Sequence, residues 1–204
     1  MINANTTQGV TELIERHARA AVNGAVEFKA VTAAFGAAYI SNEAAYAVGG
    51  HAALDCLERE AAGCDAVYLA CFGDPGLFAL REAASVPVIG MAEASMREAA
   101  KRGRFSIVTG GPAWNPILRR LALALDVSNE LLSVRALPLP GPELAARPEL
   151  ISAEVEKARN EGAQSVIIGG AALSGLAGKL ESKVPLIDSV ECGARAAARA
   201  CSPT

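Results

Sequence analysis

The chain has 204 residues, of which 51% are hydrophobic and 20% are charged, and its formal net charge at pH 7 is −3. These values exclude a disordered chain, because enough apolar surface is present to form a core, and they give no basic surface for nucleic acid. No apolar run reaches the roughly 18 residues of a membrane span, and the N-terminus lacks the pattern of a signal peptide. We therefore expect a cytoplasmic protein, without membrane contact, that acts on a small molecule.

Short β-branched runs alternate with alanine-rich helical stretches, which is the pattern of a parallel sheet covered by helices. The predicted strands are 1–3, 26–31, 66–70, 87–90, 105–109, 133–137, 165–169 and 185–188. The predicted helices are 8–22, 43–62, 76–84, 92–102, 114–125, 147–161, 174–181 and 189–200. The proline-rich segment 138–142 is expected to be a rigid loop that lines or covers a binding cleft.

The sequence also repeats itself. Residues 65–77 are echoed by 164–176, with an offset of 99 residues (166 − 67), and the later Val-Pro pairs are 98 residues apart (184 − 86). This repeat predicts an α/β fold of two pseudo-symmetric lobes, each a four-stranded parallel sheet flanked by helices, with the active site in the cleft between them. The first repeat is 1–92 and the second 93–204, and we expect the C-terminal helix, 189–204, to be able to pack on the first repeat.

In parallel sheets of this kind, ligands bind outside the carboxyl ends of the strands. The strand-exit loops are therefore the segments in which to seek a site. The predicted substrate-binding residues in these loops are Asn5, Thr6, Phe72, Gly73, Thr109, Gly110, Gly170 and Ala171. The chain contains no GxGxxG or Walker pattern, so no nucleotide cofactor is predicted.

Cys71 is the candidate catalytic residue. It ends an apolar strand and precedes a turn that opens a helix, where helix amides would lower its pKa from about 8.5 and make it a base or nucleophile. The alternative interpretation is a small buried strand-end residue. Asp74 is expected to cap the helix at Pro75, and Trp114 either walls the pocket or packs in the core.

The other cysteines and the histidines predict no metal site. The five cysteines are odd in number and show no CxxC or other close ligand spacing, which fits a reducing compartment. The two histidines, His17 and His51, stand in helical segments with no His or Cys three or four residues away.

Residues 2–7, 65–77 and 86–90 resemble the aspartate/glutamate racemase superfamily, in particular its hydantoin and allantoin racemase branch. The resemblance implies two α/β lobes, an active site between them and no cofactor. It also implies two cysteines on opposite faces of a carbon acid, one removing a proton as thiolate and the other returning a proton as thiol. Two opposed acid–base groups suit racemisation, because the carbanion must be reprotonated on its other face.

The chain departs from that pattern at the second cysteine, because Gly170 stands opposite Cys71 in the repeat. A two-thiol mechanism is therefore not available at these positions. We expect an isomerase, racemase-like and cofactor-independent, that uses the single thiol of Cys71 on a hydantoin, an amino-acid-like compound or a carboxylate.

Two alternatives stay open. One is a single-cysteine decarboxylase or other lyase, and the other is a catalytically inactive homologue that binds a small ligand. The composition also permits a homo-oligomer.

Overall fold

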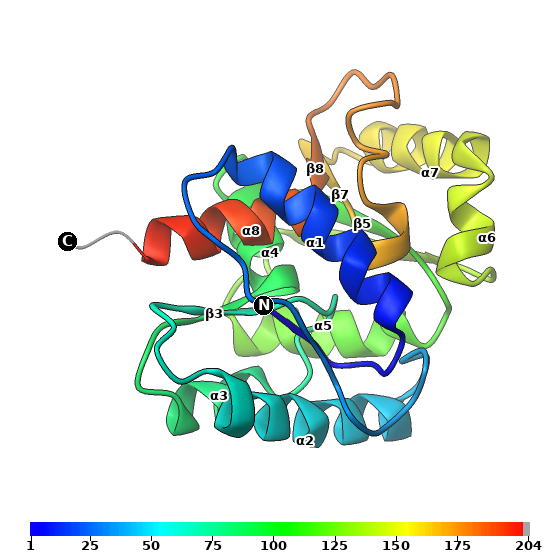
Figure 1. Ribbon diagram of the computed structural model, residues 1–204. Helices are drawn as coiled ribbons and strands as arrows, with labels where there is room; N and C mark the ends of the chain where they lie inside the picture. The colour runs from blue at the N-terminus through cyan, green and yellow to red at the C-terminus, as the bar shows by residue number, and fades with distance from the viewer. Residues whose placement is uncertain (202–204) are drawn as a thin grey trace.

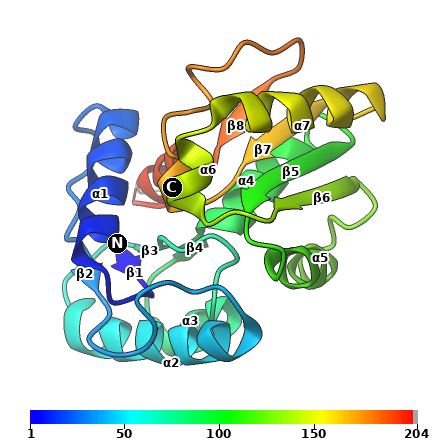
Figure 2. The ribbon, with the colours of Figure 1, turned by 90° about the vertical axis from the view of Figure 1, so that its right-hand side faces the viewer.

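The computed structural model describes residues 1–201 and contains two four-stranded parallel sheets, each covered by helices (Figures 1 and 2). The strand orders are β2-β1-β3-β4 and β6-β5-β7-β8, which are the same order in the two halves of the chain. The strands are β1 (Ile2–Asn3), β2 (Val31–Thr32), β3 (Val67–Leu69), β4 (Val88–Gly90), β5 (Phe105–Gly110), β6 (Leu131–Leu137), β7 (Ser165–Ile168) and β8 (Leu186–Asp188). The predicted fold class of two lobes is thus confirmed.

Helices form most of the crossover connections that parallel strands require. They are α1 (Gln8–Val22), α2 (Glu43–Glu60), α3 (Leu77–Ala83), α4 (Met91–Ala100), α5 (Trp114–Ala124), α6 (Gly141–Ala145), α7 (Pro148–Asn160), the 3-10 turn η1 (Ala171–Leu173) and α8 (Ser189–Ala200). Residues 202–204, the end of the predicted segment 189–204, lie outside the described range.

Three predictions about the elements were wrong in detail. The strand expected at 26–31 is reduced to Val31–Thr32, which pair with Ile2 and Asn3 of β1, whereas the Phe28 carbonyl accepts a hydrogen bond from the Arg19 side chain instead of from a strand. The helix expected at 174–181 is replaced by the earlier turn η1 and a series of turns, in which Gly175 takes a positive φ of 77°. Part of the loop expected at 138–142 begins the short helix α6.

The hydrogen-bond register of the sheets establishes which residues of the two lobes are equivalent. Leu69 of β3 lies opposite Ile2 of β1, and Ile168 of β7 lies opposite Val108 of β5. The same two residues, Leu69 and Ile168, pair with the last residues of β4 and β8. Cys71 and Gly170 each follow two residues later, so they occupy equivalent places at the ends of equivalent strands.

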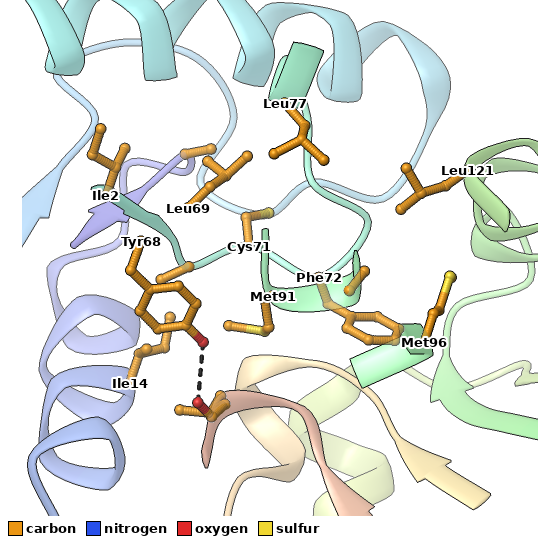
Figure 3. Close-up of a cluster of buried hydrophobic side chains, with 14 of the residues drawn as sticks. Ile2, Ile14, Tyr68, Leu69, Cys71, Phe72, Leu77, Met91, Met96 and Leu121 are labelled. Atoms are coloured by element: carbon orange, nitrogen blue, oxygen red, sulfur yellow. Dashed lines mark hydrogen bonds between the residues drawn. The ribbon is translucent and has the colours of Figure 1, made fainter. Parts of the chain in front are cut away.

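The last helix of each half also contacts the sheet of the other half. Helix α4 follows the first sheet but also contacts β7 and β8, whereas α8 follows the second sheet and contacts β3, β4 and α1. Figure 1 shows α8 lying beside α1 and α4. The phenol of Tyr68, on β3, donates a 3.1 Å hydrogen bond to the carbonyl of Val190 at the start of α8 (Figure 3). One buried apolar cluster consequently contains residues from both lobes.

This packing predicts that replacing a helical glycine by alanine, which normally stabilises a protein, destabilises it at Gly193. A Cβ on Gly193 of α8 would overlap the Tyr68 ring, whereas a Cβ on Gly9 of α1 would meet nothing within 4 Å. Alanine normally stabilises a helix relative to glycine by up to about 1 kcal/mol. We expect that gain for Gly9→Ala, but a loss of about 1–3 kcal/mol for Gly193→Ala, because Tyr68 must move. Urea unfolding of both variants checks this, and stabilisation of Gly193→Ala would contradict the packing.

Candidate active site

A cavity of about 90 Å³ lies between the lobes at the carboxyl ends of the strands. The first lobe contributes Asn5, Val10, Tyr39, Ile40 and residues 70–72, and the second contributes Thr109, Gly110, Trp114, Gly141, Pro142 and residues 169–173. A space of this size suits a small molecule. It lies where parallel sheets bind ligands, because the strand-exit loops of both lobes converge there.

Seven of the nine predicted site residues line this cavity. They are Asn5, Cys71, Phe72, Thr109, Gly110, Gly170 and Ala171. The other two, Thr6 and Gly73, do not. The Thr6 amide donates to the carbonyl of Ala37, and Gly73 lies against the Trp114 ring and accepts a 2.8 Å hydrogen bond from the Tyr46 hydroxyl.

Tyr39 and Ile40, which follow β2, line the cavity but were not among the residues predicted from the sequence. Their counterparts after β6, Gly141 and Pro142, lie in the proline-rich segment that was expected to line or cover the cleft. The signal that could have found Tyr39 is the repeat itself, because the loops after β2 and β6 hold equivalent places in the two sheets. Trp114, for which two interpretations were open, is buried and also lines the cavity.

Asn5 is held rigidly at the end of β1. Its side-chain oxygen accepts hydrogen bonds from the Asn3 amide (3.1 Å) and from the backbone N–H of Thr7 (2.9 Å). Asn3 is fully buried and also donates to Thr11 at 3.0 Å. The Nδ2 group of Asn5 donates to no other residue in the described part of the chain, so it is available as a donor to a molecule in the cavity.

Cys71 lies at the end of β3 among the buried side chains of Phe72, Leu77 and Met91 (Figure 3). The expectation that helix amides lower its pKa was wrong. Burial raises the pKa of the Cys71 thiol from 9.0 to about 12, and the negative charge of Asp74 adds to the rise. Only 8% of Cys71 is exposed, and that part faces the cavity, so the thiol can still act on a bound molecule.

Asp74 is a helix cap, but not of the helix that was predicted. Its carboxylate accepts hydrogen bonds from the backbone N–H groups of Ala92 (2.9 Å) and Glu93 (2.7 Å), in the first turn of α4, whereas α3 has no side-chain cap. Burial raises the pKa of Asp74, and the two α4 amides oppose that rise. A Cβ on Gly90 would overlap the carboxylate, so glycine at the end of β4 makes room for this cap. Asp74 thereby ties the Cys71 loop to α4.

Gly170 has a backbone conformation that side chains rarely adopt, with φ at 114°. Its N–H donates to the Ser189 hydroxyl at 3.1 Å, and a Cβ built on it would meet only the Thr109 hydroxyl, at 3.8 Å. Space for a side chain is therefore present, but the backbone favours glycine. Thr109 itself donates to the carbonyl of Gly169 at 2.9 Å.

The cavity wall is apolar apart from a few donors and acceptors, and no charged side chain of residues 1–201 lines it. The backbone N–H groups of Phe72, Ala171 and Ala172 lie in the strand-exit turns and donate to no other described residue. Such amides are suited to bind carbonyl oxygens.

Residues 1–201 contain no group of three or more His, Cys, Asp or Glu side chains that could hold a metal ion. Within the same range, every helix is too short or too polar to cross a membrane.

Comparisons with known proteins agree with this architecture. The family model described as Asp/Glu/Hydantoin racemase matches residues 1–197. A hydantoin racemase from Pseudomonas sp. (strain NS671) is 32% identical, over 96% of this chain and 82% of its own. The solved structures of allantoin racemases from Klebsiella pneumoniae and Pseudomonas fluorescens are 33% and 27% identical, with TM-scores of 0.89 and 0.88. Both alignments cover 96% of this chain, and they cover 84% of the Klebsiella pneumoniae chain and 87% of the Pseudomonas fluorescens chain. The chain belongs to the Asp/Glu/hydantoin racemase family and is an enzyme of the isomerase class.

Proposed function

We propose that this enzyme moves the α-hydrogen of an uncharged cyclic amide of the hydantoin class, with Cys71 as the base. The observation that carries this proposal is a buried thiol in a small cavity that contains no charged side chain among its lining residues. The thiolate of Cys71 removes the hydrogen from the carbon beside a carbonyl group, and the electron pair passes to the carbonyl oxygen as an enolate. No cofactor takes part in this step.

Donors around the cavity support the enolate. These donors are the Asn5 Nδ2 group and the backbone N–H groups of Phe72, Ala171 and Ala172. They come from both lobes and donate to no other residue in the described part of the chain. Hydrogen-bond donors that are already in place stabilise a developing oxyanion without reorganisation. A ring with two carbonyl oxygens can engage both sets of donors.

The absence of charge from the described cavity wall favours a neutral substrate over an amino acid or a dicarboxylate. A carboxylate in this cavity would be desolvated, and no Lys, Arg or His is among the described residues that line the cavity and could pair with it. Burying an unpaired charge costs several kcal/mol. Burial of a neutral amide ring costs much less free energy, because its carbonyl oxygens accept hydrogen bonds from the N–H groups of the cavity wall.

Gly170 favours a second candidate function, a single-thiol lyase. If carbon dioxide leaves the substrate instead of a proton, one acid suffices, and Cys71 as thiol could protonate the resulting carbanion. That reaction needs a malonate-type dianion in the uncharged cavity, so we rank it below the isomerase.

Proton NMR in D₂O tests the proposal on a panel of 5-substituted hydantoins, allantoin, amino acids and aryl malonates. We expect deuterium at the α-carbon of the neutral rings and none at that of the amino acids. Exchange confined to amino acids would contradict the proposed substrate class. Carbon dioxide release from malonates would establish the lyase, and binding without turnover would indicate an inactive homologue.

A further inference from the structure

Racemisation needs a proton donor on the face of the carbon that Cys71 does not reach. Three side chains on the described cavity wall carry a proton on oxygen or sulfur: Cys71, Thr109 and Tyr39. Thr109 already donates its proton to Gly169 and is an alcohol, which is a far weaker acid than a phenol of pKa about 10. Tyr39 is therefore the side chain on this wall best suited to be the second acid.

Tyr39 belongs to the first lobe but reaches the wall of the second. A Cβ built on Gly141, at the start of α6, would be 3.4 Å from the Tyr39 hydroxyl oxygen and 3.0 Å from the methyl group of Ala172. Ala172 lies two residues after Gly170 in the second strand-exit turn. The hydroxyl is thus held beside the second-lobe turn, whereas the thiol comes from the equivalent turn of the first lobe.

The segment that carries Tyr39 is anchored on both sides. The Thr7 hydroxyl donates to the carbonyl of Ala38 at 2.6 Å, and the Thr6 amide donates to the carbonyl of Ala37 at 3.1 Å. Ile40 is buried and packs against Gly49 of α2. Partial burial raises the pKa of Tyr39, which keeps the phenol protonated near neutral pH. The residue is still 41% exposed, so its proton can exchange with water.

We propose that Tyr39 is the second acid–base residue of the racemisation and works on the face opposite Cys71. This inference rests on the proposed function. In one direction the Cys71 thiolate takes the α-hydrogen to form the thiol, and the Tyr39 O–H gives its proton to the other face of the enolate, leaving the phenolate. Water then returns a proton to the phenolate and removes the proton from the thiol. In the other direction the phenolate takes the hydrogen and the thiol returns one.

The test compares Tyr39→Phe with wild type on each pure enantiomer of a 5-substituted hydantoin in D₂O, following optical rotation and α-deuterium together. We expect racemisation to fall on the order of 10²-fold or more. One enantiomer should still exchange its α-hydrogen without inversion at a rate close to wild type, because Cys71 still serves that face, while the other enantiomer stops exchanging. A merely structural role would slow both enantiomers equally.

Tyr46→Phe is the matched control, because the Tyr46 hydroxyl supports Gly73 and is absent from the cavity wall. In Tyr46→Phe, the α-hydrogens of the two enantiomers should exchange at equal rates. Racemisation by Tyr39→Phe at the wild-type rate, or equal loss of exchange from both enantiomers, would overturn the role of Tyr39. Absence of exchange in the wild-type enzyme would instead overturn the proposed function.

Discussion

Cys71→Ser is expected to reduce α-hydrogen exchange by on the order of 10³-fold or more and to leave the protein folded. The physical reason is that serine keeps the size of the side chain but replaces a thiol with an alcohol that hardly ionises, and a positioned general base contributes roughly 10²–10⁴-fold. The measurement is deuterium incorporation by proton NMR, with thermal unfolding of both proteins recorded alongside.

Cys56→Ser is the control for this substitution. Cys56 is as deeply buried as Cys71, with 3% exposed against 8%, but it lies on α2 and outside the cavity. It should lose some stability, because a hydroxyl replaces a thiol in the core, yet retain activity. Full exchange activity in Cys71→Ser would remove Cys71 from the mechanism.

The rate of exchange should rise with pH, by about tenfold per unit from pH 7 to pH 9. Because burial raises the pKa of the Cys71 thiol to about 12, only a small minority of molecules carries the thiolate between pH 7 and pH 9, and each added pH unit multiplies this fraction by about ten. The rate rises with pH because the thiolate, which is the basic form of Cys71, removes the α-hydrogen. Measurement of kcat/KM against pH reports this group in the free enzyme.

Thermal unfolding across the same pH range separates this effect from loss of the fold. Tyr39→Phe should keep the rising profile for the enantiomer that Cys71 serves, because the phenol does not act on that face. A plateau between pH 7 and pH 8 would show a thiol whose pKa is lowered, and a profile that levels off near pH 9 would show one whose pKa is ordinary. Either result would contradict the desolvation of Cys71 as the controlling effect.

Local sequence patterns and the internal repeat encode those parts of the fold and of the site that could be predicted from the sequence. Helices 8–22 and 189–200 form with the predicted bounds, since apolar periodicity and end signals specify them locally. The equivalence of Cys71 and Gly170 came from the repeat and agrees with the strand register. The residues at the strand exits likewise follow from the rule that parallel strands present their carboxyl ends together.

Other properties of the site depend on contacts between distant segments. The repeat places the loop of Tyr39 at the edge of the cavity, but Tyr39 carries no motif of its own, and the position of its ring depends on the hydroxyl of Thr7 and the backbone of Gly141. The helix capped by Asp74 begins at Met91, far along the chain, so a local cap rule pointed to the wrong one. The pKa of Cys71 was mispredicted because the depth of its burial is a tertiary property.

The way α4 and α8 cross between the halves restricts how a substrate can enter. Since each helix contacts both sheets, separating the lobes as hinged bodies would break a shared core and expose its apolar surface to water. A substrate is therefore expected to enter without separation of the two sheets, and the same rigid frame keeps the two strand-exit turns that face the cavity at a fixed spacing throughout turnover.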